Sequence, residues 1–160
     1  MDKQIWLGLV GLNGSGKSTV CNFLKKEGFK VLSLSDIVRK TATENKLSLS
    51  RENLIKTGTM LKEQYGPDIL AKKCLIEAKD LGNKVIFDSI RHPKEAECLS
   101  QNGVHLLEVS ASLETRYQRI QKRQDTTDNC SFETFKKLET TETSGQSKGQ
   151  NITETLKFCR

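Results

Sequence analysis

Short apolar runs alternate along the chain with longer stretches that have helical periodicity. Nearly continuous apolar runs of this length are typical of strands that are buried on both faces of a parallel sheet. Glycine or Asn-Gly turn signals precede the later runs, which separates them from the helical stretches before them. The predicted strands cover residues 4–10, 30–34, 84–87 and 104–109.

The stretches between these runs carry apolar residues at the three- and four-residue spacing of amphipathic helices. One helix is expected to begin near Gly16, with Val20, Phe23 and Leu24 at helical spacing. The other predicted helices cover residues 35–45, 50–64, 67–81, 93–100 and 112–123. Strands that alternate with helices predict an α/β fold of three layers, with a small parallel sheet of about four strands.

The composition changes after residue 125. Residues 125–129 and 139–151 are polar and rich in Thr, Ser, Gly and Gln, and they flank a predicted helix at 132–138. Residues 152–159 predict one more short helix, and no apolar strand follows Ile152. We therefore expect a single domain over residues 1–160.

Composition narrows the classes of function. The chain has 160 residues, 26 Lys and Arg against 20 Asp and Glu, and 6% aromatic residues. The net charge of +6 suits an anionic ligand, while the scarcity of aromatic residues argues against a base-stacking surface for nucleic acid. No apolar run is long enough for a membrane span. Five irregularly spaced cysteines predict reduced thiols and a cytoplasmic protein.

The strongest chemical signal lies directly after the first predicted strand. Residues 11–18 match the phosphate-loop pattern G-x-x-x-x-G-K-[ST] at every fixed position, and a predicted helix follows. Backbone N–H groups of such a loop and the positive end of the helix dipole bind phosphate oxygens. We expect the nucleotide to be bound by Gly11, Asn13, Gly14, Ser15, Gly16, Lys17, Ser18 and Thr19. The alternative is a chance glycine-rich turn between strand and helix.

Two residues of this loop have specific expected roles. Lys17 should reach the β- and γ-phosphates of ATP, and the Ser18 hydroxyl should bind Mg²⁺. Asp88 ends the third apolar run, which is where phosphate-loop proteins place a second residue for the metal. Arg91 follows just beyond the strand end, where an arginine can bind a phosphate with two hydrogen bonds. The alternative is that Asp88 caps the next helix and Arg91 is a surface charge.

A second pair of charged residues follows the second predicted strand. Asp36 and Arg39 are three residues apart, so they lie on nearly the same helix face. One interpretation is an acceptor site, in which Arg39 and Arg91 bind the phosphate of the acceptor and Asp36 orients it. The alternative is that Asp36 caps the helix and Arg39 is a solvated charge.

Arginines recur along the helix predicted at 112–123. Arg116, Arg119 and Arg123 have three- and four-residue spacing and so share one helix face. Such a stripe is often only the solvated face of a helix. Because a polar segment follows at once, it also fits the hinge of a lid that carries arginines onto a phosphoryl group.

The chain resembles nucleoside monophosphate kinases of the adenylate-kinase type, and in particular a compact group with dephospho-CoA-kinase-like members. The motifs that carry this resemblance are GLNGSGKST (11–19), SDIVRK (35–40), YGPDILA (65–71), DSIRHPKEAE (88–97) and ETRYQRIQKR (114–123). The resemblance implies a phosphate-loop nucleotide-hydrolase fold with ATP and Mg²⁺ as donor. It further implies that Arg39 and Arg91 contact the acceptor phosphate, that Asp88 serves the metal, and that Arg119 and Arg123 bind the donor base and phosphates. Lys17, Asp88, Arg119 and Arg123 are then the expected catalytic residues.

The sequence departs from this family in three places. The expected lid, about residues 124–145, is short and has a single cysteine, Cys130, so that no zinc is expected. Ser89 stands where the family usually has glycine. The family's final strand, expected after residue 159, is missing, which predicts a truncated product or a strand supplied from elsewhere.

Three functions remain open from the sequence. The first is transfer of a phosphoryl group from ATP to a nucleoside monophosphate or a similar small phosphorylated acceptor. The second is phosphorylation of a hydroxyl, as in dephospho-CoA kinase, with Asp36 as the base. The third is a nucleotide-binding sensor without catalysis, because related modules occur fused to deaminase-like modules of nucleotide metabolism.

Overall fold

The computed structural model describes residues 3–123, 130–143 and 151–160. Its strands are β1 (Ile5–Val10), β2 (Lys30–Ser33), β3 (Lys84–Asp88) and β4 (His105–Glu108), and they form a parallel sheet in the order β2-β3-β1-β4. The predicted α/β class and four-stranded parallel sheet are confirmed. In this order β1 lies between β3 and β4, so the loop that leaves β1 emerges beside the ends of both neighbours.

The helices are α1 (Lys17–Lys26), α2 (Leu34–Glu44), α3 (Arg51–Tyr65), α4 (Ile69–Leu81), α5 (Pro93–Gln101), α6 (Leu113–Lys122), α7 (Phe132–Thr143) and α8 (Ile152–Leu156). Most bounds agree with the periodicity within two residues. The prediction of a helix end at residue 138 was wrong, because α7 continues to Thr143. Threonines are poor but not forbidden helix residues, and the hydroxyls of Thr140 and Thr143 bond to carbonyls one turn earlier.

The two faces of the sheet pack against different helices. In β1, Leu9 packs with Cys21 of α1 and Ile86 of β3 on one face. Trp6 and Val10 point to the opposite face, where α4 and α5 lie with the larger hydrophobic core. Because successive side chains of a strand alternate between its faces, a continuous apolar run is what a sheet covered by helices on both faces requires.

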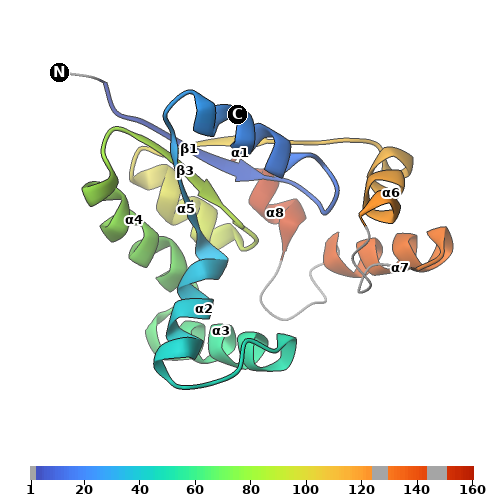
Figure 1. Cartoon of the computed structure of the whole chain (residues 1–160), viewed down its shortest axis with the longest axis horizontal. Coiled ribbons are helices and arrows are strands. Elements are labelled where there is room, and N and C mark those ends of the chain that lie inside the picture. Colours follow the sequence, from blue (N-terminus) through green and yellow to red (C-terminus); the bar gives the residue numbers. More distant parts are fainter. Residues whose placement is uncertain (1–2, 124–129, 144–150) are drawn as a thin grey trace.

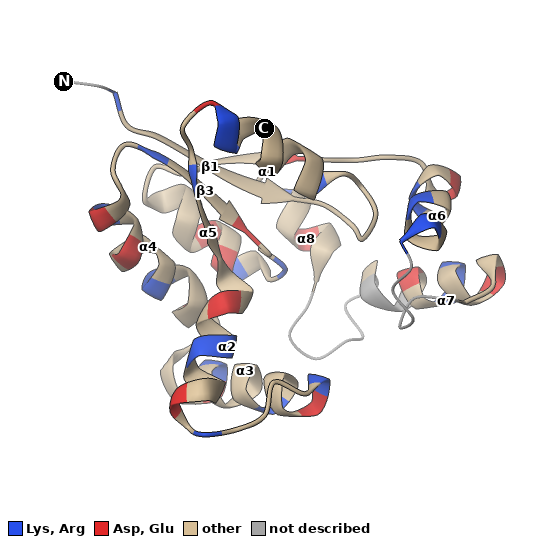
Figure 2. Ribbon diagram, in the orientation of Figure 1, with Lys and Arg blue, Asp and Glu red and all other residues tan. Residues whose placement is uncertain are grey.

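Two helical pairs extend from this three-layer body (Figure 1). The α2–α3 pair lies beyond the carboxyl end of β2, and the α6–α7 pair lies beyond the end of β4. Figure 2 shows basic and acidic segments alternating on most helices, with α6 mainly basic. Within the described ranges, no helix has the length and apolarity needed to cross a bilayer.

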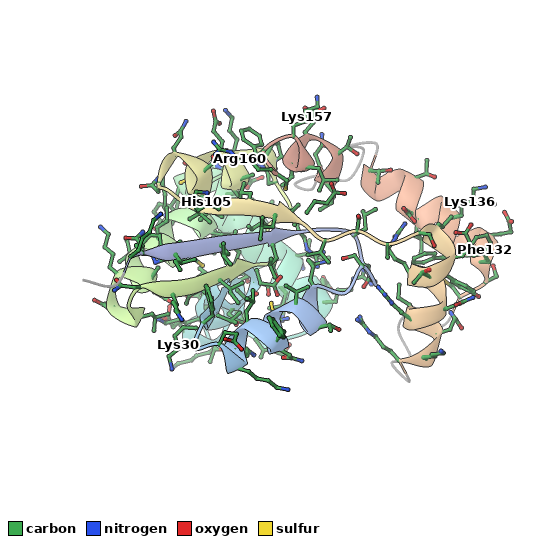
Figure 3. All side chains as sticks on the ribbon, turned by 90° about the horizontal axis from the view of Figure 1, so that it is seen from above. Lys30, His105, Phe132, Lys136, Lys157 and Arg160 are labelled. Atoms are coloured by element: carbon green, nitrogen blue, oxygen red, sulfur yellow. The ribbon has the colours of Figure 1, made fainter. Side chains whose placement is uncertain are left out.

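The outer edge of β4 meets the last residues of the sequence. The backbone N–H of Arg160 donates to the carbonyl of Leu106, at 3.0 Å. Figure 3 shows Arg160 next to His105 at this edge, and both residues line a small cavity of about 220 Å³. The described part of the chain forms no strand beyond β4 in the sheet.

Candidate functional site: a phosphate loop with converging cations

The loop between β1 and α1 is built as the sequence predicts. Gly14 and Gly16 have φ of 76° and 108°, a left-handed conformation that glycine adopts without steric cost. Gly16 caps α1 without a side chain, so the first N–H groups of that helix remain open toward the loop. The loop therefore presents backbone donors to an anion, as a phosphate-binding cradle does.

Gly11 fixes where this loop passes the end of β4. A Cβ at this position would lie 2.2 Å from the carbonyl oxygen of Val109 and 2.8 Å from Oγ of Ser15. Val109 is itself held by its N–H bond to the carbonyl of Val10, at 2.8 Å. Backbone on one side and a buried side chain on the other thus leave no room for a methyl group.

We expect Gly11→Ala to weaken both the fold and the loop. Forcing a methyl group against a fixed carbonyl should lower the free energy of unfolding by about 1–3 kcal/mol, and it should weaken Mg·ATP binding because the loop must shift. Gly58→Ala on α3 is the control, since its Cβ would meet only ordinary contacts at 3.8 Å. Urea denaturation and calorimetric titration measure the two effects. Wild-type ATP affinity in Gly11→Ala would contradict this account of the loop.

Lys17 folds back onto its own loop. Its ammonium donates to the carbonyls of Gly11 and Leu12, at 2.6 and 3.0 Å. Burial lowers the pKa of Lys17; Asp88 partly opposes this effect, and Arg91 and Arg123 add to it. The lysine therefore lies in a partly buried place near two further cations, where a bound anion would stabilise its charge.

A cavity of about 260 Å³ lies in front of the loop. Its walls are residues 11–18, residues 88–91, Arg123 and Ile152. The carboxyl ends of β1 and β3 and the end of α6 thus meet at one place. The cavity brings together side chains that the sequence predicts for the site, namely Lys17, Ser18, Asp88, Arg91 and Arg123.

Two polar atoms beside this cavity have no hydrogen-bond partner among the described residues. They are Oδ1 of Asp88 and Oγ of Ser15, and both are buried. A buried carboxylate oxygen without a donor is costly, so it signals a missing cation or donor. Ser18 and Asp88 lie at the same cavity, and oxygen ligands of this kind are those that Mg²⁺ takes. The site therefore fits a magnesium–nucleotide, with Ser18 and Asp88 as the metal-side residues.

A second cleft of about 510 Å³ lies on the other side of the loop. It is lined by Ser15, Gly16, Thr19, Val20, Val109, Arg119, Lys122 and Arg123. Ser15, Gly16 and Arg123 border both spaces, so the cleft adjoins the phosphate cavity.

The three arginines of the α6 segment have different surroundings. Arg116 is 4% exposed and bonds to the carbonyl of Ala111 and to Glu139 of α7. Arg119 donates to the carbonyls of Gly14 and Ser15, at 3.1 and 3.0 Å. Arg123 follows the helix end and lines both spaces. Arg116 and Arg119 share a helix face, as predicted, because both donate to carbonyls of the phosphate loop. The alternative of a solvated face is wrong for Arg116, because packing against α7 buries it.

The acceptor-side residues predicted from the sequence lie at a neighbouring strand end. Arg39 donates to Oδ1 of Asp36 and to Oγ of Ser35, at 2.8 and 2.9 Å. Asp36 does not cap α2, because the helix begins one turn earlier than a cap at that position requires and its N-cap residue is Ser33. Asp36 and Arg39 do not line the phosphate cavity itself.

A hydroxyl network connects this strand end to the phosphate side. Oγ of Ser33 bonds to the hydroxyls of Ser35 and Ser89, at 2.8 and 3.0 Å. Ser89 follows Asp88 and has φ of 63°, a conformation that disfavours residues other than glycine. This explains why the resemblance leads one to expect glycine here, and the hydrogen bonds of Ser89 offset part of its strain.

Sequence reasoning missed two acidic residues near the site, Glu95, which is buried, and Glu139, which is partly buried. Glu139 pairs with Arg116, and Glu95, only 2% exposed, bonds to the backbone of residues 91 and 92. The position of Glu95 three residues after His92, with Pro93 between, is the spacing of a helix capping box and was a readable signal. No sequence signal marks Glu139, because its partner lies 23 residues away. The predicted lid is described only for residues 130–143, and the rest of it lies outside the described residues.

Comparison with known proteins agrees with this geometry. A family model described as an AAA domain matches residues 7–139. The UPF0200 protein of Methanococcus vannielii is 32% identical over 81% of this chain and 72% of its own length. The UPF0200 protein MJ1399 of Methanocaldococcus jannaschii is 31% identical over 82% of this chain and 69% of its own length. A UPF0200/UPF0201 protein of Archaeoglobus fulgidus is 31% identical, and the chain spans only 45% of its length.

A solved structure gives the same result at the level of the fold. TT1252 from Thermus thermophilus superposes with a TM-score of 0.59 and 26% sequence identity, over 86% of this chain and 80% of that one. Residues 7–139, which the family model matches, include the phosphate loop, the strand end at Asp88 and α6. The chain therefore belongs to the AAA domain family and has a P-loop kinase-like fold of the kind that binds nucleotides for phosphoryl transfer.

Proposed function

We propose that this protein transfers the terminal phosphoryl group of ATP to a nucleoside monophosphate or a similar small phosphorylated acceptor. The observation that carries the proposal is the cavity in which Lys17, Arg91 and Arg123 surround one space beside the unpartnered carboxylate oxygen of Asp88. Three cations at one cavity repel one another unless anions lie between them. Two phosphates, one from a donor and one from an acceptor, supply that charge.

The reaction asks little of the protein beyond alignment and charge neutralisation. An acceptor phosphate oxygen bonds to the γ-phosphorus while the bond from that phosphorus to the β–γ bridging oxygen breaks, and ADP leaves with the electron pair. The attacking oxygen is already anionic, so no base is needed. Lys17 neutralises the transferring group, Arg123 binds the donor phosphates and Arg91 binds the acceptor phosphate. Magnesium, held by Ser18 and Asp88, would add neutralising charge.

Hydroxyl phosphorylation would need a base, and Asp36 was the candidate from the sequence. Its side chain is 69% exposed and is paired with Arg39. Asp36 also does not line the phosphate cavity, so its position favours a role in holding Arg39 instead.

The test is an unbiased acceptor screen with ATP labelled at the γ-phosphate, with Asp36→Asn in parallel. We expect label to move to one or more nucleoside monophosphates, with Asp36→Asn keeping at least about a tenth of the wild-type rate because no proton transfer is lost. Label appearing on a sugar or pantetheine hydroxyl, together with complete loss in Asp36→Asn, would replace the proposal with hydroxyl phosphorylation. Tight binding of Mg·ATP without any labelled product would indicate a sensor.

A further inference from the structure

A buried carboxylate lies directly behind Arg91. Oε2 of Glu95 accepts hydrogen bonds from the backbone N–H groups of Arg91 and His92, each at 3.1 Å. Its other oxygen, Oε1, is 3.3 Å from the ammonium of Lys62 on α3. The Glu95 side chain is 2% exposed and that of Lys62 is 22% exposed. One carboxylate therefore joins the turn that carries Arg91 to a helix of the α2–α3 pair.

The backbone of Arg91 is held at both ends. Its N–H donates to Glu95, and its carbonyl accepts from the N–H of Asn151 at the start of α8, at 3.0 Å. The preceding residue, Ile90, is 2% exposed and packs in the core. Within the described ranges the guanidinium of Arg91 has no ion pair of its own. The contacts thus fix the backbone and leave the charged group to the cavity.

Fixing the backbone of Arg91 keeps its charged side chain at the cavity. Arg91 shares the cavity with Lys17 and Arg123, and like charges in a confined space repel. An exposed arginine on a loose turn would move into solvent. Hydrogen bonds from two N–H groups to one carboxylate oxygen are charge-assisted and are stronger than bonds to a neutral acceptor.

The link to α3 is the second part of the arrangement. α3 packs against α2, which carries Asp36 and Arg39. Removing Lys62 would leave the buried Glu95 carboxylate with backbone N–H donors but without a cation. Leaving a buried charge without its partner is strongly destabilising. A displacement of α3 would have the same effect as that removal.

We propose that Glu95 is a positioning residue that holds Arg91 toward the phosphate cavity, and that the Lys62–Glu95 pair couples the placement of α3 to that arginine. What Arg91 binds rests on the proposed function. The coupling itself rests only on the contacts among α3, α5 and the turn at residues 89–92.

A simpler explanation is that Glu95 only caps α5, in a capping box with His92. A cap of that kind needs no cation from another helix and is usually solvated. The cap explanation predicts a loss of stability in Glu95 variants and no specific effect of Lys62 on residues 91 and 92. The two explanations therefore separate in Lys62 variants.

The first experiment does not depend on function. Lys62→Met and its control Lys56→Met, which breaks the exposed Lys56–Glu52 pair on the same helix, are compared by amide hydrogen exchange. We expect exchange at Arg91 and His92 to rise at least about tenfold in Lys62→Met, relative to β3 amides such as Ile86. Unchanged exchange at these two amides, or an equal rise at Ile86, would overturn the coupling.

Nuclear magnetic resonance of His92 gives an independent readout, because the chain has 2 histidines. Burial and Lys62 lower the pKa of His92, while Glu95 raises it. The pKa of His92 should therefore rise in Lys62→Met and fall in Glu95→Gln, with Glu52→Gln in the exposed Lys56–Glu52 pair of α3 as the control for the latter. No change in either variant would show that the pair is not formed in solution.

The second experiment uses Mg·ATP and whichever monophosphate the acceptor screen identifies. We expect Lys62→Met and Glu95→Gln to raise KM for the monophosphate about tenfold while KM for Mg·ATP changes less than twofold. An equal loss at both substrates would reduce Glu95 to a structural cap. If the wild type phosphorylates no acceptor, the proposed function fails, and the exchange experiment alone decides the coupling.

Discussion

Replacing Lys17 by Met is expected to abolish phosphoryl transfer without unfolding the protein. Methionine keeps most of the length of the side chain and removes the charge that neutralises the transferring group. Loss of one preorganised charged donor of this kind lowers kcat by about 100- to 1,000-fold, equivalent to roughly 3–4 kcal/mol. The fold should survive, since among the described residues the ammonium bonds to two loop carbonyls, those of Gly11 and Leu12, and both residues line the cavity.

Lys25→Met is the matched control, because Lys25 is an exposed lysine in the last turn of the same helix. Initial rates are measured with labelled ATP at saturating acceptor, and circular dichroism checks the fold. Turnover within a factor of two of wild type in Lys17→Met would mean that the phosphate loop is not the catalytic centre. That result would also remove the basis for assigning Arg91 and Arg123 to phosphates.

The second large effect is expected when the ion pair between Arg116 of α6 and Glu139 of α7 is broken. The guanidinium of Arg116 is 5% exposed and binds Glu139, whose side chain is 18% exposed. It also bonds to the carbonyl of Ala111 at 3.0 Å and lies over the ring of Phe135 at 5.9 Å. Glu139→Ala leaves the cation buried, which costs about 3–5 kcal/mol of unfolding free energy. Glu139→Gln should cost less, because an amide oxygen can still accept from Arg116.

This pair also supports the phosphate loop. A Cβ on Gly14 would lie 2.8 Å from the backbone carbonyl of Arg116, so the first turn of α6 is in close contact with the loop. We therefore expect Glu139→Ala to weaken Mg·ATP binding as well as stability. Urea denaturation measures the stability, and Glu154→Gln in the exposed Lys157–Glu154 pair is the control, expected to stay within about 0.5 kcal/mol. Equal stability of the two variants would show that α7 does not pack on α6 as described.

Local sequence patterns predicted much of this site because its core is local. The phosphate loop is a contiguous segment, and its glycines, lysine and serine line one cavity. Asp88 could be placed because strand ends in a parallel sheet meet at one edge. Arg91 followed from its three-residue distance to Asp88, and Arg123 from the helical repeat.

The errors came from contacts between segments far apart in the chain. In the sequence, Arg116 is part of an arginine stripe that is typical of an exposed helix face, but α7 buries it. No residue near position 116 predicts that its partner is Glu139. Asp36 looks like a helix cap, but α2 begins at Leu34 because tertiary packing buries that leucine at 1% exposure. Glu95 has the spacing of a cap, and only the approach of α3 shows that it also binds a lysine.

The sequence alone determined the three-layer α/β fold, the position of the phosphate loop and the place of Lys17 within it. Hydrophobic periodicity and backbone sterics are properties of short segments, so they can be predicted without knowledge of the tertiary structure. Tertiary structure decided which charges are buried, which are paired and which remain available to a ligand. Burial and pairing depend on atoms that are distant in sequence, and these set the cost of a charge and hence its role.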